Sequence, residues 1–163
     1  AAVAGVPHMV FGCPKNRIID HPDQYPIGVR FFADCADYAA EKGVVIGMEA
    51  NPAIYGTNYL NTTLEALRLV QIIGSPSLRL NLDLGTIIAN QEGVDSVLAA
   101  IPYVGHVQIS EPGLAKIVSR PEHVELARLL IAQGYEGWVS LEMRNLGLTD
   151  LFSSLEITAG LFG

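Results

Sequence analysis

The sequence predicts an α/β fold in which parallel strands form a barrel-like sheet. Short apolar runs alternate with stretches of helical periodicity along the whole chain, and this alternation is typical of βαβ units. Several apolar runs end on a polar or acidic residue, at the strand ends where parallel folds carry their chemistry. The segments KGVVIGMEA, around residue 49, and EGWVSLEMR, around residue 142, repeat one strand and its terminal glutamate. Such a repeat favours a serial barrel over a sheet with one unique site strand.

Length, composition and charge narrow the class of protein. With 163 residues, half of them hydrophobic, the chain predicts one globular domain over residues 1–163. A formal net charge of −7 repels nucleic-acid phosphates, and no apolar run approaches the ~20 residues of a membrane span. Cys13 and Cys35 lack metal-type spacing and are interpreted as thiols of a reducing compartment. We therefore expect a cytoplasmic domain that binds neither nucleic acid nor membrane.

The individual elements follow from periodicity and from glycine and proline boundaries. Apolar runs predict five strands, at 7–12, 44–49, 78–84, 106–110 and 138–143. Apolar residues at helical spacing predict helices at 27–42, 62–73, 94–100, 122–133 and 149–161. Because a closed (β/α)₈ barrel needs about 250 residues, the five strands predict a partial barrel.

Four strand ends offer oxygen ligands for a metal ion. Successive strand residues face opposite sides, so the mixed small and polar face of each strand is expected to point into the barrel and the aliphatic face toward the helices. A single acidic residue at such a position is more often a rim residue or a helix cap than a ligand. It is the shared inward parity of four residues that predicts a metal site, and these are Glu49, Asp83, Gln108 and Glu142.

The segments EANPAIYGTNYLNTT, LNLDLGT, GHVQISEP and SLEMR resemble the sugar phosphate isomerase/epimerase superfamily with the xylose isomerase-like TIM barrel, which includes tagatose epimerases, hydroxypyruvate isomerases and inosose dehydratases. The resemblance implies that Glu49 and Glu142 bind the metal and exchange protons with the substrate, and that Asp83 binds the metal between them. Gln108 stands where many members have the second His of an H-x-H run, of which this chain keeps His106. The second glutamate that epimerases place after the first is missing, and Tyr55 lies near its position.

The resemblance aligns the five strands with the fourth to eighth strands of a complete barrel. Either an N-terminal part of the barrel is missing from this sequence, or a second copy or another polypeptide covers the sheet edges at 7–12 and 138–143. We therefore expect a homo-oligomer or a longer barrel.

Loop residues near the predicted rim form the candidate substrate site. Lys15 and Arg17 follow the first strand and either meet a substrate phosphate or are solvated loop cations. Asn and Tyr side chains after Glu49 can read sugar hydroxyls or offer a stacking face, although such residues are also ordinary in loops. The predicted set is completed by Asn51, Tyr55, Asn58, Tyr59 and Glu111.

Five other residues receive structural interpretations. We expect a hydrogen-bonded core imidazole at His106 and surface positions for His21 and His123. Trp138 and Met143 are expected to serve packing.

The donor chemistry defines the predicted reaction. Three carboxylates and an amide suit Mn²⁺ or Mg²⁺, with Co²⁺ or Zn²⁺ also possible. A divalent ion that holds a substrate carbonyl and its neighbouring hydroxyl acidifies the C–H between them, so the two glutamates can move the proton through an enediolate. We thus predict an isomerase or epimerase of a sugar or sugar phosphate. The alternatives are a degenerate barrel that binds a polyol or a partner chain, and an endonuclease-IV-like phosphodiesterase, which needs more His and Asp ligands and a basic face.

Overall fold

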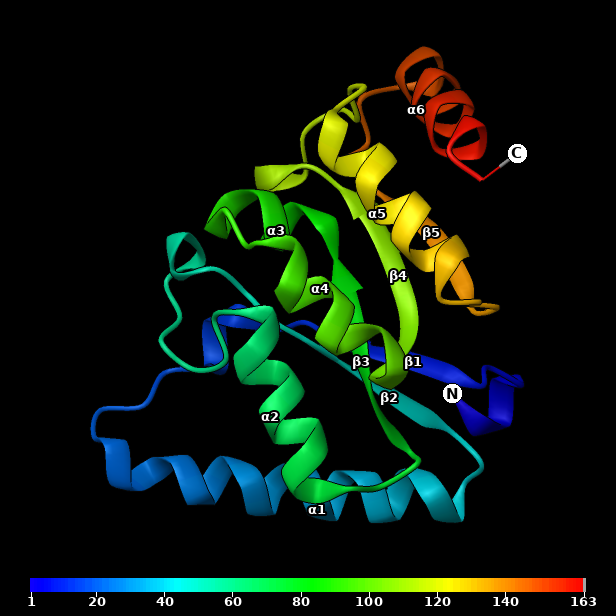
Figure 1. Ribbon diagram of the computed structural model, residues 1–163. Coiled ribbons are helices and arrows are strands. Elements are labelled where there is room, and N and C mark those ends of the chain that lie inside the picture. Colours follow the sequence, from blue (N-terminus) through cyan, green and yellow to red (C-terminus); the bar gives the residue numbers. More distant parts are fainter. Residues whose placement is uncertain (163) are drawn as a thin grey trace.

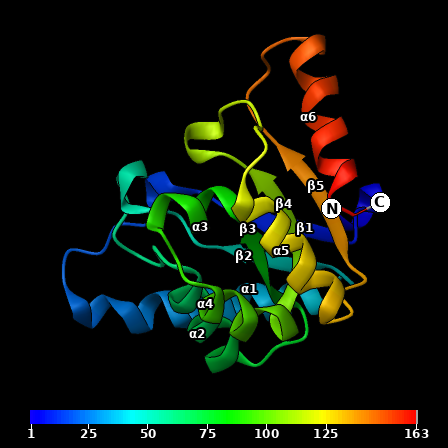
Figure 2. The same ribbon diagram turned by 45° about the horizontal axis from the view of Figure 1, so that its top comes forward.

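The computed structural model describes residues 1–162, apart from the side chain of Val94. Its centre is one parallel sheet in the order β1-β2-β3-β4-β5, which curls into part of a barrel (Figures 1 and 2). The strands are β1 (His8–Phe11), β2 (Val45–Glu49), β3 (Leu78–Asp83), β4 (Val104–Ser110) and β5 (Trp138–Glu142). The predicted partial α/β barrel is confirmed.

Helices connect successive strands and pack on one side of the sheet (Figure 1), and the last helix follows the fifth strand. They are α1 (Tyr25–Glu41), α2 (Thr63–Ile73), α3 (Leu84–Asn90), α4 (Val94–Ala100), α5 (Pro121–Ala132) and α6 (Leu148–Gly160). At the start of α2 the Thr62 hydroxyl accepts from the Glu65 amide, and the Glu65 carboxylate accepts from the Thr62 amide. Gly74 ends α2 with φ 65°, a backbone conformation in which glycine carries no steric penalty.

Sequence reasoning missed α3 and placed the other five helices within about two residues of their ends. Helix α3 begins directly after β3, with Asp83 as its N-cap. The segment LGTIIAN continues an apolar strand and contains three β-branched residues, so nothing in its periodicity separates it from the strand before it.

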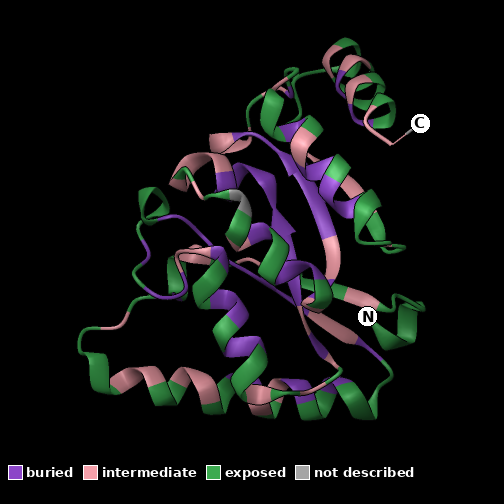
Figure 3. Ribbon diagram, in the orientation of Figure 1, coloured by how far each residue is buried: buried purple, intermediate pink, exposed green. Residues whose placement is uncertain are grey.

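The core lies between the sheet and the helices, where the strand residues are buried (Figure 3). Met48, Leu80, Leu82, Val107 and Ile109 are at most 1 % exposed. They are the residues whose alternation predicted an outward aliphatic face. The intervening residues of the same strands face the concave side, which carries the polar groups.

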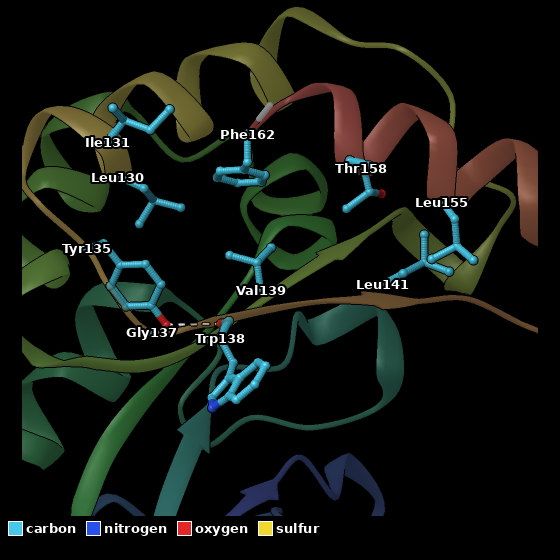
Figure 4. Close-up of a pocket in the computed structure, with 11 residues that line it drawn as sticks. Leu130, Ile131, Tyr135, Gly137, Trp138, Val139, Leu141, Leu155, Thr158 and Phe162 are labelled. Carbon is cyan, nitrogen blue, oxygen red and sulfur yellow. Dashed lines mark hydrogen bonds between the residues drawn. The ribbon is translucent and has the colours of Figure 1, made fainter.

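Strands β1 and β5 each have an unpaired outer edge in the described part of the chain. Trp138, expected to pack, is 78 % exposed, so that prediction is wrong. Trp138 is the first residue of the edge strand β5. Figure 4 shows its indole on the opposite side of the strand from Val139 and Leu141. Those two residues line an apolar cleft of about 450 Å³ between β5, α5 and α6, while Trp138 has no next strand to cover it.

No helix in residues 1–162 combines the length and the apolar character that crossing a membrane requires.

Candidate functional site

The sheet register brings the four predicted metal ligands to one face at the carboxyl ends of the strands. Asp83 pairs with Gln108 across β3 and β4, and Ser110 pairs with Glu142 across β4 and β5. Glu49 pairs with Asn81, which lies two residues before Asp83 on β3. Because paired residues share a face, the inward parity expected from the sequence places these side chains together.

Both carboxylate oxygens of Glu49 accept hydrogen bonds. Glu49 is 8 % exposed, its Oε1 accepts from Asn51 Nδ2 at 2.8 Å, and its Oε2 accepts from Asn81 Nδ2 at 2.8 Å. Burial, and then repulsion by Asp83 and Glu142, raise the pKa of Glu49 to about 7, against the opposing effects of Asn51 and Arg17. A carboxyl with this pKa can both accept and release a proton near neutral pH.

Arg17 lies behind Glu49 and is 5 % exposed. Its Nη1 donates to the Glu49 carbonyl at 2.7 Å and its Nη2 donates to Asn51 Oδ1. Asn51 in turn donates to the Glu49 carboxylate, so a buried guanidinium orders the strand end through two contacts. The reading of Arg17 as a solvated loop cation is therefore wrong, whereas Lys15 is exposed as that reading requires.

Asp83 is held by its own helix and by β4. Its Oδ1 accepts from the Thr86 amide at 2.6 Å and its Oδ2 accepts from the Ser110 hydroxyl at 2.6 Å. Burial raises the pKa of Asp83, and the hydrogen bonds from Ser110 and Thr86 oppose that rise. Ser110 and Thr86 were absent from the predicted site, although the sequence shows that Ser110 shares the inward parity of Gln108.

An amide network lies below the carboxylates. Asn81, 2 % exposed, donates through Nδ2 to Glu49 and to Gln108 Oε1, and its Oδ1 lies 2.6 Å from His106 Nδ1. The hydrogen bond expected at His106 is confirmed, but its imidazole is only partly buried and does not belong to the core. The ring of His8 lies beside that of His106, with centroids 5.5 Å apart, and a Cβ at Gly47 would lie 2.5 Å from His8 Nε2. Glycine at position 47 thus leaves room for the histidine pair.

Glu142 differs from Glu49 in how it is held. It is partly buried, and burial followed by repulsion from Asp83 raises its pKa. Within the described residues its side chain accepts no hydrogen bond. The structure thus brings Glu142 to the site without fixing its orientation.

The predicted substrate residues separate into different environments. Asn51 joins Glu49, as described, and Tyr55 Oη accepts from the Gly113 amide at 2.8 Å, which connects the loops after β2 and β4. Asn58 pairs with the backbone of Ile19 in both directions, at 2.8 and 2.7 Å. Tyr59 is 5 % exposed and lies against Gly28, where a Cβ would be 2.2 Å from its hydroxyl.

Glu111 and His123 are buried beside the partly exposed Arg120. Glu111 is 3 % exposed and accepts from Arg120 Nε at 2.8 Å through both oxygens, and His123 Nε2 lies 3.8 Å from Glu111 Oε1. His123 is fully buried, so its predicted surface position is wrong: it lies on the inner side of α5, two residues after Pro121. Burial lowers the pKa of His123. His21 is exposed, as expected.

The sequence model of the xylose isomerase-like TIM barrel family matches residues 1–156. The chain belongs to this family. L-ribulose 3-epimerase of Methylomonas sp. (strain DH-1) is 40 % identical over 77 residues, which are 47 % of this chain and 27 % of that protein. The match thus covers about a quarter of the length of this curated relative.

Solved structures of two D-psicose 3-epimerases share the fold. A D-psicose 3-epimerase in the presence of D-fructose superposes with a TM-score of 0.81 and 17 % identity, over 99 % of this chain and 66 % of that one. D-psicose 3-epimerase from Clostridium cellulolyticum H10, with D-tagatose, gives a TM-score of 0.75 and 19 % identity, over 90 % and 59 %. Both matches leave more than a third of the compared structure without a counterpart here.

The donor set of this xylose isomerase-like site fits a divalent cation. Three buried or partly buried carboxyls lie on the same face of the sheet, and burial followed by like charge raises the pKa of Glu49 and Glu142. A dication would replace that repulsion with attraction and return the carboxyls to their ionised form. In residues 1–162 no three His, Cys, Asp or Glu side chains already form a metal-binding cluster. The fit therefore rests on donor chemistry and on convergence.

Proposed function

We propose that this chain carries the catalytic rim of a divalent-metal-dependent epimerase or isomerase that acts on a sugar or a sugar phosphate. The convergence of Glu49, Asp83 and Glu142 on one rim, with a pKa of about 7 at Glu49, carries the proposal. The epimerase relatives support the substrate class. A homo-oligomer or a longer barrel, cytoplasmic location and the absence of a nucleic-acid partner remain predictions.

Glu49, Asp83 and Glu142 would hold the metal, with Mn²⁺ or Mg²⁺ preferred by hard oxygen donors. When bound, the ion would polarise a substrate carbonyl and stabilise negative charge that develops on its oxygen. Asp83 keeps a fixed orientation because Thr86 and Ser110 donate to both of its oxygens. Arg17 and Asn51 fix the end of β2, and thereby the position of Glu49.

Glu49 and Glu142 then serve as the two proton carriers. In the ionised form, one glutamate removes the proton from the carbon beside the substrate carbonyl. For epimerisation the other glutamate returns a proton to the opposite face of that carbon, and for isomerisation a proton goes to the former carbonyl carbon. The distinct environments of the two glutamates allow one to be ionised while the other is protonated, as two-base proton transfer requires.

Incubation with ketoses in D₂O tests the proposal. With Mn²⁺ or Mg²⁺ present, proton exchange should place deuterium at the carbon beside the carbonyl, and proton NMR under Mg²⁺ detects the loss of that signal. D-fructose, D-tagatose and D-psicose are suitable first substrates, followed by their phosphates. Stoichiometric metal binding without exchange on any of them would favour the alternative, a barrel that binds a polyol without turnover.

A further inference from the structure

We propose that Gln108 donates a hydrogen bond from Nε2 to a substrate oxygen and does not bind the metal through Oε1. The proposal rests on the proposed function, because it assigns a role within the same site. It departs from the expectation, drawn from sequence, that Gln108 is a metal ligand.

Asn81 determines how the Gln108 amide is turned. When Glu49 is ionised, its Oε2 can only accept, so the Asn81 group 2.8 Å away is the NH₂ end. The same Nδ2 reaches the Gln108 amide, and the atom that it meets there has to be an acceptor, which is Oε1. His106 Nδ1, 2.6 Å from Asn81 Oδ1, then donates, and all three contacts of Asn81 agree.

With Oε1 directed at Asn81, the Nε2 end of the Gln108 amide points away from Asn81. Asn81 uses both of its N–H groups, one on Glu49 and one on Gln108. In the described residues no group accepts from Gln108 Nε2, and this atom is not among the buried polar atoms that lack a partner. Since Gln108 is 9 % exposed and pairs with Asp83 in the sheet, its free donor reaches solvent beside the carboxylates.

The charge of that donor decides its partner. An amide N–H₂ carries partial positive charge and cannot bind a cation, whereas a sugar carbonyl or hydroxyl oxygen accepts from it. A fixed donor beside an oxygen that gains negative charge stabilises the enediolate more than the ground-state carbonyl. The Nε2 end of the amide therefore complements a substrate oxygen. Oε1 already accepts from Asn81 and is neutral, so the three charged carboxylates are the stronger donors to a hard dication.

Two binding measurements separate a donor from a ligand. We expect Gln108→Met, which keeps the length and removes both amide atoms, to bind Mn²⁺ within about threefold of the wild type by calorimetry. Asp83→Asn, which removes a charged ligand, should weaken Mn²⁺ binding at least tenfold. Ser140→Ala, a change of the sheet neighbour of Gln108, is the matched control and should alter nothing. A loss of Mn²⁺ affinity in Gln108→Met as large as that in Asp83→Asn would overturn the proposal.

Turnover and NMR give two further tests. Gln108→Met should lower kcat about a hundredfold, the loss seen when one donor to a developing oxyanion is removed, and an unchanged kcat would contradict the proposal. In Mg²⁺-loaded protein, D-fructose should shift the Gln108 Nε2 proton and nitrogen signals, identified by their absence from Gln108→Met. If the protein neither binds Mn²⁺ nor exchanges protons, the proposed function fails, while the same D-fructose-dependent shift, recorded in metal-free protein, still decides the role of Gln108. Signals that D-fructose leaves unmoved would overturn it.

Discussion

The two ends of the candidate site are built differently, although the sequence pattern makes them look alike. At the β2–β4 end, Glu49 is 8 % exposed and both of its oxygens accept hydrogen bonds. At the β5 end, Glu142 is partly buried on an edge strand and its side chain has no hydrogen-bond partner in the described residues. A repeated strand and terminal glutamate therefore specify position, while neighbouring strands specify how firmly the carboxyl is held.

The largest expected effect comes from removing the carboxyl of Glu49 or of Glu142, which compares the two ends of the site directly. Glu49→Gln should lower kcat about a thousandfold, within the range for a lost acid or base, and Glu142→Gln should lower it at least a hundredfold. Both variants should keep the wild-type circular dichroism spectrum. Proton exchange of a ketose with D₂O measures the rates. If either variant kept more than about a tenth of kcat, a loss of only ~1.4 kcal/mol of barrier reduction, that residue would not carry a proton.

The next prediction concerns how stability depends on pH, and it tests the environment of Glu49 at the β2 end of the site. The pKa of Glu49 rises from 4.5 to about 7 on folding, so between these values the folded protein binds more protons than the unfolded chain. The contribution of the Glu49 carboxyl to the free energy of unfolding is fully present below pH 4.5. In metal-free protein this contribution decreases by about 3 kcal/mol as the pH rises through 7. Urea unfolding across this range measures it, with Glu49→Gln as the control. A wild-type pH profile parallel to that of Glu49→Gln would contradict the pKa.

Replacing Arg17 tests whether its hydrogen bonds order the end of β2. Arg17→Met removes the donors to the Glu49 carbonyl and to Asn51, and should lower the free energy of unfolding by about 2 kcal/mol. Arg128→Met is the matched control, because Arg128 pairs with Glu125 on the exposed face of α5, where ion pairs add little. Urea unfolding compares the two, and equal midpoints would show that Arg17 does not order the strand end.

The smallest expected effect is steric. Gly47→Ala places a methyl group 2.5 Å from His8 Nε2 and 3.2 Å from Asn81 Cβ, and overpacking of this kind should cost about 1 kcal/mol. Gly160→Ala adds the same methyl group to α6, where it meets nothing within 4 Å, and should be neutral or slightly stabilising. Thermal unfolding measures both. If the Gly47→Ala protein were as stable as Gly160→Ala, a methyl group at position 47 would not conflict with the side chain of His8.

Periodicity and parity in the sequence were enough to predict the strands, most helices and the inward set of site residues. These features depend on local pattern, which the sequence carries directly. Helix α3 was missed because β-branched residues continue the apolar run of β3. The burial of Arg17 and His123 and the contacts of Asn81 depend on pairing between segments that lie far apart in the chain, for example 32 residues for Arg17 and Glu49. No local spacing encodes such pairing.

Calorimetric titration of Mn²⁺ tests the central claim, that the carboxylates of this rim form a divalent-metal site. Because Glu49 has a pKa of about 7, metal binding at pH 6.5 should displace its proton, and the heat should change with the ionisation enthalpy of the buffer. We predict one Mn²⁺ per chain with proton release in the wild type, and loss of that release in Glu49→Gln. An absence of Mn²⁺ binding, or binding with the same proton release in both proteins, would contradict the account.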